Sequence, residues 1–353
     1  MSVATPRSFN PAFRAAFESK ISSLYGKKHL SNPTECQRII DKLDLRTKYN
    51  CSKLDIIDVN SGAGLFSVML NYELKPRNHI LIEHNPHFHA HLAQKLEMAR
   101  EISNNAENFQ LLNWNPFRWS TYSSLFEEKI LPWPSEQPQD KIHDELLIVA
   151  NWTGPRDESL IAQWISCCGA RNWLMKYGKI RMVLFGPPAS IRKFMSDPGF
   201  RRRNRTALKR ELFTESKLIA IEPGENEAGK DYDPRVLVRD QPLVLAKDAC
   251  VKDRELTVLE VVRGQYTTED IANIEHLLSP IFLNTVPLKH KLHKLAPGAE
   301  YLARFLPESL LEKNSKWLTK EDVVSIAEAY EKWPFKPTIE ETFDITEVSQ
   351  YGH

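Results

Sequence analysis

Residues 54–64, with the sequence LDIIDVNSGAG, indicate the class of fold. Leu54–Val59 is a short run that is apolar apart from its two aspartates, and a glycine-rich turn follows it directly. Such a run is typical of a buried strand in a parallel sheet, and such a turn opens a helix that can hold a nucleotide-like cofactor. Gly62 and Gly64 permit close backbone approach to a ligand. Asn60 stands where these turns usually carry glycine, and asparagine tolerates positive φ.

Similar short runs recur along the first two thirds of the chain and alternate with segments of helical spacing. Runs that are apolar on both faces are typical of parallel strands with helices on either side. The alternation therefore predicts a doubly wound α/β domain over residues 31–266. Two late runs, Lys217–Ile221 and Glu255–Val262, are expected to close its sheet as a hairpin. The other expected strands are His79–Glu83, Phe109–Leu112, Glu145–Ala150 and Ile180–Phe185, with helices at His91–Arg100 and Glu158–Tyr177.

The last part of the chain has a different pattern. Thr319, with Asp322 three residues later, forms a helix-capping signal before an apolar stripe, and Pro334 ends that helical pattern. We therefore expect a small helical domain over residues 267–337. Residues 338–353 carry four acids and no lysine or arginine, which predicts a flexible acidic tail.

Composition excludes several classes of protein and hides a charge asymmetry. The 353 residues are 42% hydrophobic and 26% charged, as in soluble globular proteins and unlike disordered, collagen-like or coiled-coil chains. The net charge is +1, from 47 basic and 46 acidic residues. Ile191–Lys217 contains nine Lys and Arg against three acids, whereas Pro337–His353 contributes −4. A neutral total therefore combines a basic segment with an acidic tail.

The cysteines predict neither disulfides nor a metal site. Their number is odd and no CxxC spacing occurs, which indicates a reducing compartment and no structural zinc. They are Cys36, Cys51, Cys167, Cys168 and Cys250.

The N-terminal segment, residues 1–30, has the composition of an import signal. Its first 17 residues contain Arg7, Arg14 and no acid, and three phenylalanines fall on one helical face. That pattern is typical of a mitochondrial import signal, and an ordinary N-terminal helix explains it equally well. No apolar run approaches the roughly 18 residues of a membrane span, so we expect no membrane partner.

Two later strands end in polar residues. Glu83 lies 19 residues after Gly64, which suits a carboxylate gripping two ribose hydroxyls; a turn that binds nothing is the alternative. Asn151-Trp-Thr-Gly154 stands where adenine amino-methyltransferases carry a polar residue, a proline and an aromatic that stacks on the flipped base. Thr153 replaces the proline and Gly154 replaces the aromatic. We therefore expect a methyltransferase scaffold without its chemistry.

Motifs across residues 30–337 carry a specific resemblance. The most specific are PFRWSTYS at 116–123 and WPFKP at 333–337. The chain resembles the fungal mitochondrial transcription factor B family, whose fold is that of the rRNA adenine dimethyltransferases. The other similar stretches are LSNP at 30–33, IIDKLDL at 39–45, the turn at 58–64, VANWTG at 149–154, QWISC at 163–167 and NWL at 172–174.

The resemblance implies a fold and a function. The α/β domain would be a Rossmann-like class I methyltransferase domain, and the protein would lie in the mitochondrial matrix. It would be a promoter-specificity subunit of the single-subunit mitochondrial RNA polymerase, a partner that it helps to melt promoter DNA while holding the non-template strand. The acidic tail would reach toward the polymerase active site.

The resemblance also implies where a cofactor pocket lay. Asn115 stands where the dimethyltransferases have aspartate near the adenine ring, and this departure, with Asn60, counts against cofactor binding. We expect no catalytic residue, no required cofactor and a vestigial S-adenosylmethionine pocket. Carried over by motif, that pocket consists of Leu30, Gly62, Gly64, Glu83, Asn115 and Asn151.

Two groups of residues are candidates for DNA binding. Phe117 and Trp119 flank Arg118, and aromatics beside a cation form a stacking platform for an unpaired base. Core packing of these two aromatics is the alternative. The basic segment would attract phosphate, unless it is simply a solvated helix face. Its candidate residues are Arg192, Lys193, Arg201, Arg202, Arg203 and Arg205.

Three functions fit this sequence, and two of its features separate them. The first is the non-catalytic initiation factor, the second an active rRNA adenine dimethyltransferase using S-adenosylmethionine, and the third a methyltransferase relic that binds RNA in ribosome assembly. Thr153 and Gly154 favour the first over the second. The PFRWSTYS and WPFKP motifs favour the first over the third.

Overall fold

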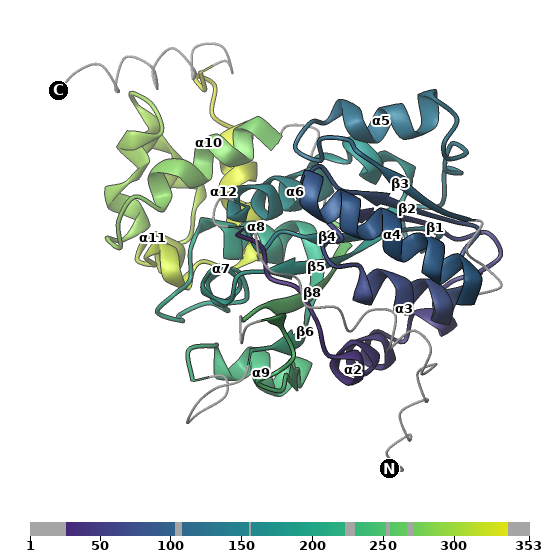
Figure 1. Cartoon of the computed structure of the whole chain (residues 1–353). Coiled ribbons are helices and arrows are strands. Elements are labelled where there is room, and N and C mark those ends of the chain that lie inside the picture. The colour runs from purple at the N-terminus through teal and green to yellow at the C-terminus, as the bar shows by residue number, and fades with distance from the viewer. Residues whose placement is uncertain are drawn as a thin grey trace.

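The computed structural model describes residues 26–102, 108–154, 157–222, 230–251, 255–266 and 271–337 (Figure 1). At its centre lies an eight-stranded sheet in the order β3-β2-β1-β4-β5-β8-β6-β7. Every strand expected from the sequence is present, and three of them, β4, β5 and β6, are longer than the apolar run. The strands are β1 Asp55–Val59, β2 Asn78–Ile82, β3 Phe109–Leu112, β4 Ile142–Asn151, β5 Lys179–Gly186, β6 Thr214–Ile221, β7 Leu243–Val244 and β8 Thr257–Arg263.

The expected hairpin of the two late strands is wrong in its connection. β6 and β8 do pair antiparallel, but α9 (Pro234–Asp240) and β7 lie between them in the chain. β8 inserts between β5 and β6 and is antiparallel to both. All seven of its residues are buried, so it needs a strand on each side and cannot sit at an edge. The β1–β5 half of the sheet is parallel throughout.

Helices cover both faces of the sheet, as the apolar runs predict (Figure 1). Successive side chains of a strand point to opposite faces. Ile56 accordingly packs in the cluster formed with α2 and α3, while Ile57 packs in the cluster formed with α5, α6 and α8. The helices of the first face are α2 Pro33–Leu43, α3 Leu65–Leu74 and α4 Pro86–Ile102, and those of the second are α5 Ser120–Glu127, α6 Glu158–Ala170 and α8 Arg205–Phe213.

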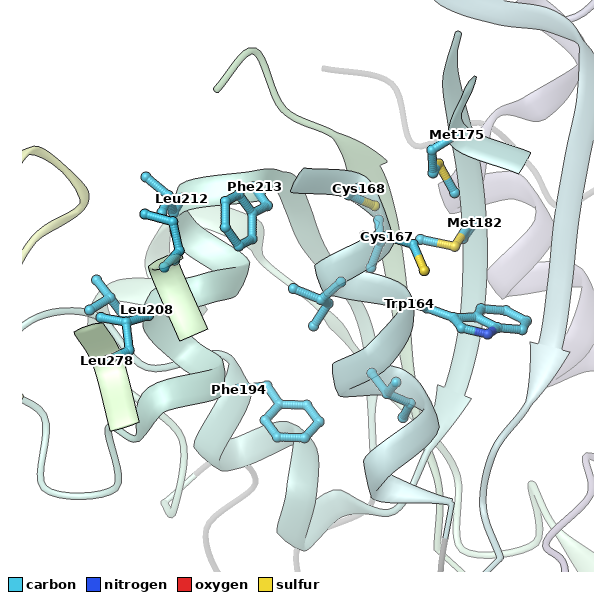
Figure 2. Packing of buried hydrophobic residues seen from close by; sticks show 14 of the residues in the cluster. Trp164, Cys167, Cys168, Met175, Met182, Phe194, Leu208, Leu212, Phe213 and Leu278 are labelled. Carbon is cyan, nitrogen blue, oxygen red and sulfur yellow. The ribbon is translucent and has the colours of Figure 1, made fainter. Parts of the chain in front are cut away.

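The second face carries the largest core, which Figure 2 shows around α6 and α8. These helices approach closely because Gly169 has no side chain: a Cβ there would lie 2.5 Å from the Phe213 ring. The single helix expected over Glu158–Tyr177 is wrong. Arg171, at φ 49°, ends α6, and a separate 3₁₀ helix, η3 (Trp173–Tyr177), follows.

The C-terminal helices pack on α8 and share its core, as Leu278 beside Leu208 illustrates (Figure 2). The capping signal expected at Thr319 is confirmed: its hydroxyl accepts from the Asp322 backbone N–H, and the Asp322 carboxylate accepts from the Thr319 N–H. Residues 1–25 of the expected import segment (residues 1–30) and the acidic tail lie outside the described residues. The remaining elements are η1 Leu45–Thr47, α7 Pro188–Phe194, α10 Ile271–Ile281, η5 Leu288–His290, η6 Leu292–Lys294, η7 Ala299–Phe305, α11 Glu308–Leu311, η8 Ser315–Trp317 and α12 Lys320–Glu331.

Candidate functional site

The carboxyl ends of β1, β2 and β4 meet at one edge of the sheet. Val59 pairs with Ile82 on one side and with Ala150 on the other, so the three following segments lie together. The turn after β1 keeps the shape that the glycine pattern predicts, with φ of 60° at Gly62 and 82° at Gly64. Asn60 takes φ 56°, which confirms that asparagine serves in place of glycine there.

The Glu83 carboxylate is fully buried and already engaged. It accepts hydrogen bonds from the Gly62 N–H at 3.2 Å and the Asn85 N–H at 2.9 Å. Lys27 places its Nζ 3.6 Å from Glu83 Oε1 and donates to Asn60 Oδ1 at 2.6 Å. Burial lowers the pKa of Lys27, and the Glu83 charge opposes that shift. The chain itself therefore supplies the donors that two ribose hydroxyls would offer.

His29 fills the space above the glycine turn. A Cβ added at Gly62 would overlap the His29 ring, which also contacts Phe88 edge-on with centroids 4.6 Å apart. Burial lowers the pKa of His29 to about 3, with a smaller contribution from the Lys27 charge, so the ring is neutral at physiological pH. Leu30 is buried beside it and bridges to Cys250. The cavity that remains along the turn measures about 30 Å³, whereas small-molecule pockets span roughly 300–1,000 Å³.

Asn151 and Gly154 are also occupied by the chain. Asn151 donates from Nδ2 to the Lys28 carbonyl at 2.8 Å and accepts from the Thr153 hydroxyl at 2.6 Å. Asp157 fills the space beside Gly154: its Oδ2 accepts from the Gly154 N–H at 3.0 Å, and a Cβ at Gly154 would lie 2.6 Å from it. An aromatic ring at position 154 would therefore collide with the Asp157 carboxylate.

Asn115 has a local structural role. Its Oδ1 accepts from the Phe117 N–H at 2.9 Å, and its carbonyl accepts from the Thr121 hydroxyl at 2.6 Å, so it shapes the loop after β3. An open, polar cavity of about 400 Å³ lies beside it, lined in part by His84 and Arg118. This cavity is separate from the space that His29 fills.

Phe117 and Trp119 stand on that loop with about half of each side chain exposed. The exposed fractions are 50% for Phe117 and 46% for Trp119, so neither is a core residue. Their rings have different neighbours: Phe117 lies 5.7 Å from Trp152, and Trp119 lies 5.6 Å from Trp173, between ring centroids. The loop thus presents two aromatic rings at the carboxyl edge of the sheet, with the exposed Arg118 between them in sequence.

The basic segment is largely neutralised by nearby acids. Arg192, Arg201 and Arg202 converge on the carboxylate of Asp231, at 3.3, 3.0 and 2.6 Å. The Arg202 hydrogen bond lowers the pKa of Asp231. Arg192 also pairs with Glu222. Three guanidiniums share these two acids, so a positive excess remains at the surface, where Arg201 is the most exposed.

Arg203 requires a correction to the proposed basic surface. It is buried, donates to the Ser196 and Leu318 carbonyls at 2.7 Å each, and pairs with Glu211 at 2.6 Å. Sequence spacing could not separate it from Arg201 and Arg202, because all three belong to one arginine run.

Lys193 and Arg205 are placed differently from Arg203. Lys193 lies on α7 with its Nζ 3.5 Å from Glu158 Oε1. Arg205 is exposed at the start of α8 and forms no ion pair within the described part of the chain. Both side chains can therefore reach a partner from solvent.

Relatives identify the family of this chain. The family model described as Ribosomal RNA adenine dimethylase matches residues 18–332. Mitochondrial transcription factor 1 of Saccharomyces cerevisiae is 32% identical over 341 residues, covering 95% of this chain and 96% of the yeast protein. This chain belongs to the mitochondrial transcription factor 1 family. The resemblance predicted from the sequence motifs is thereby confirmed.

Further similarities agree with this family. Mitochondrial transcription factor 1 of Lachancea kluyveri is 27% identical over 328 residues, covering 91% of this chain and 93% of that protein. A crystal structure of a dimethyladenosine transferase from Plasmodium falciparum has a TM-score of 0.55 at 15% identity, covering 86% of this chain and 97% of that one. That structure confirms the methyltransferase fold predicted for this mitochondrial transcription factor 1 relative.

Three structural features are absent from the described part of this family member: a membrane-spanning helix, a cluster of metal ligands and a disulfide bond. No helix among them is long and apolar enough to span a membrane. No three His, Cys, Asp or Glu side chains among them gather as metal ligands would. All five cysteines are free.

Sequence reasoning missed three residues at the site. Lys27 and His29 directly precede the LSNP motif, and Asp157 lies three residues after Gly154. Only their proximity to recognised motifs could have drawn attention to them. Nothing in their spacing shows that they fold into the pocket of this transcription factor relative.

Proposed function

We propose that this chain is a mitochondrial transcription initiation factor. In this proposal it enables the single-subunit mitochondrial RNA polymerase of the matrix to recognise and melt promoters. Its relatives named mitochondrial transcription factor 1 support the general role. The observation that carries the finer role is the half-exposed pair Phe117 and Trp119, because an unpaired base needs exposed rings on which to stack.

The melted non-template strand is the partner that this surface suits. Double-stranded DNA hides its base faces, whereas an unpaired strand offers them to Phe117 and Trp119. Stacking on an aromatic ring stabilises a bound base by about 1–3 kcal/mol and tolerates any sequence. The exposed Arg118 adds a cation for the adjoining phosphate.

The arginines around Asp231 give this strand, or the duplex next to it, a second contact. Arg201 and Arg202 share a single surface carboxylate, and Arg192 divides its guanidinium between Asp231 and Glu222. A DNA phosphate can take the place of Asp231 because it presents similar oxygen acceptors with the same single negative charge. The acid would keep attraction to DNA weak until the polymerase brings promoter DNA near.

We infer that the protein requires no cofactor. The Lys27–Leu30 segment supplies groups where S-adenosylmethionine would place its ribose and methionine, and the 30 Å³ left along the glycine turn does not fit these two parts of the molecule. The residues present do not suit the cofactor, so no chemical step is assigned to this chain.

Promoter-dependent transcription with the cognate polymerase, with and without this protein, tests the proposal. Phe117→Ala with Trp119→Ala should weaken promoter opening, read from 2-aminopurine at the start site, more than it weakens polymerase binding. An opening signal that the double variant leaves unchanged would reject the stacking role. Phe305→Ala, which removes an exposed ring in the helical domain, is the matched control.

An active rRNA adenine dimethyltransferase remains the second candidate because the family model and the preserved glycine turn favour it. The Asp157 carboxylate beside Gly154 counts against it, since the stacking ring of that reaction has no room. Transfer of labelled methyl groups to small-subunit rRNA separates the two. Robust dimethylation would replace our proposal.

A further inference from the structure

A second aromatic surface adjoins the stacking loop and shares only Trp119 with it. It is a groove of about 620 Å³ between α5 and η3. Six aromatic side chains line it, together with a few polar groups that include Asn172, Lys176 and Glu127. The six are Trp119, Tyr122, Phe126, Trp133, Trp173 and Tyr177.

One side of the groove is formed by the exposed Trp133, and its base is formed by buried aromatic side chains. Trp133 is 57% exposed and stacks on the buried Phe126, with ring centroids 5.2 Å apart and planes at 27°. Tyr122 and Tyr177 are buried beneath it. The exposed face of Trp133 is therefore held in place by packing on its other side, which lowers the entropy cost of stacking a ligand there.

Trp173 is held in a costly conformation at the other wall. Its φ of 53° is a genuine outlier for a bulky residue. The ring lies between Trp119 and Trp164, at centroid distances of 5.6 and 4.8 Å. Its buried indole N–H has no acceptor among the described residues. Backbone strain and an unmet donor are both more common at binding sites than in ordinary cores.

The polar groups at the rim match the chemistry of a nucleotide. Asn172 is exposed and its amide can both donate to and accept from a base edge. Lys176 is exposed, with its Nζ 5.0 Å from the centre of the Tyr177 ring, and carries a charge suited to phosphate. Glu127 is the one acid in the lining.

We propose that this groove binds a second unpaired base of the non-template strand, next to the base held at Phe117 and Trp119. The inference rests on the proposed function. Trp119 lines the groove and also belongs to the PFRWSTYS loop. A DNA strand bound on the loop can therefore extend into the groove while its bases stay in contact with aromatic side chains. The base would stack on Trp133, while Asn172 faces its edge and Lys176 its phosphate.

A premelted promoter bubble carrying 2-aminopurine at one non-template position at a time, bound to this protein and the cognate polymerase, tests the groove. We expect quenching at two neighbouring positions. Trp133→Ala should restore the signal at only one of them and weaken bubble binding by about 5- to 150-fold, the range expected for one stacked base. Trp133→Phe should retain most of the quenching, and Phe305→Ala should change nothing. Thermal melting of each variant checks that it folds.

The outcomes separate this inference from the proposed function. No response to Trp133→Ala at any position, or a response only at the position that Phe117→Ala restores, overturns the second subsite. If the polymerase alone, without DNA, protects Trp133 from chemical oxidation, Trp133 contacts the polymerase. That result would also overturn the second subsite. If Trp133→Ala acts while Phe117→Ala with Trp119→Ala does not, the groove stands and the stacking loop of the proposed function fails.

Discussion

Single side chains carry the proposal that this pocket holds no cofactor. Lys27, His29 and Asp157 each occupy space or satisfy groups that a nucleotide and its target base would need. None of them changes the course of the backbone, and the glycine turn keeps its shape. The backbone of the glycine turn thus keeps the shape of a cofactor site, while side chains of this chain occupy the space beside it.

His29 makes the closed pocket sensitive to pH. The pKa of the ring is about 3 in the folded chain and about 6.5 when unfolded, so the unfolded state binds more protons between those values. Stability contributed by the neutral ring is present above pH 6.5 and is lost as pH falls toward 3. Between pH 7 and pH 5 we expect the wild type to lose about 2 kcal/mol more than His29→Gln, measured by urea unfolding. Parallel losses in both proteins would show that His29 does not titrate in this way.

The loop between α7 and α8 determines which arginines of the run at positions 201–203 are exposed to solvent. Residues 195–204 join α7 to α8 and contact the helical domain, where the Gly199 N–H donates to the Lys316 carbonyl at 2.7 Å. Gly199 takes φ 87°, and a Cβ there would lie 2.6 Å from the Trp317 ring. The turn directs Arg203 inward to the Leu318 carbonyl and leaves Arg202 at the surface.

Arg202 and Arg203 form a matched pair for testing that division. Arg203→Ala should lower the free energy of unfolding by about 3–5 kcal/mol, because it leaves buried carbonyls and Glu211 without their partner. Arg202→Ala should change stability by less than about 1 kcal/mol and reduce the salt slope of DNA binding by about 1. Urea unfolding and binding titrations at several salt concentrations measure both. The reverse pattern would contradict the assignment of Arg203 to the core.

The whole molecule combines a shared core with one functional edge. The helical domain buries its apolar face against α8. The parallel strands β1, β2, β3 and β4 bring the filled pocket and the aromatic loop, which follows β3, to the same end of the sheet. The surface that we propose for an unpaired strand thus lies where a methyltransferase would hold its target base. In this proposal, reuse of that edge explains how the fold persists without a cofactor.

The proposal that the protein requires no cofactor can be tested on the intact chain. We expect millimolar S-adenosylhomocysteine to leave its melting temperature unchanged. A ligand present at 100 times its Kd would stabilise the folded state by about 2.7 kcal/mol, which a thermal shift detects easily. An active rRNA adenine dimethyltransferase serves as the positive control. A clear, concentration-dependent rise with this protein would show that the Lys27–Leu30 segment moves aside.

Local patterns in the sequence were enough for the strands, the glycine turn and the Thr319 capping box, because each depends on neighbours a few residues apart. Motifs were also enough for the family. The position of β8 between β5 and β6, the burial of Arg203 and the filling of the pocket by His29 depended on contacts between distant segments. Local composition and spacing do not predict such contacts, because the burial of a residue depends on which distant segments pack against it in the folded chain.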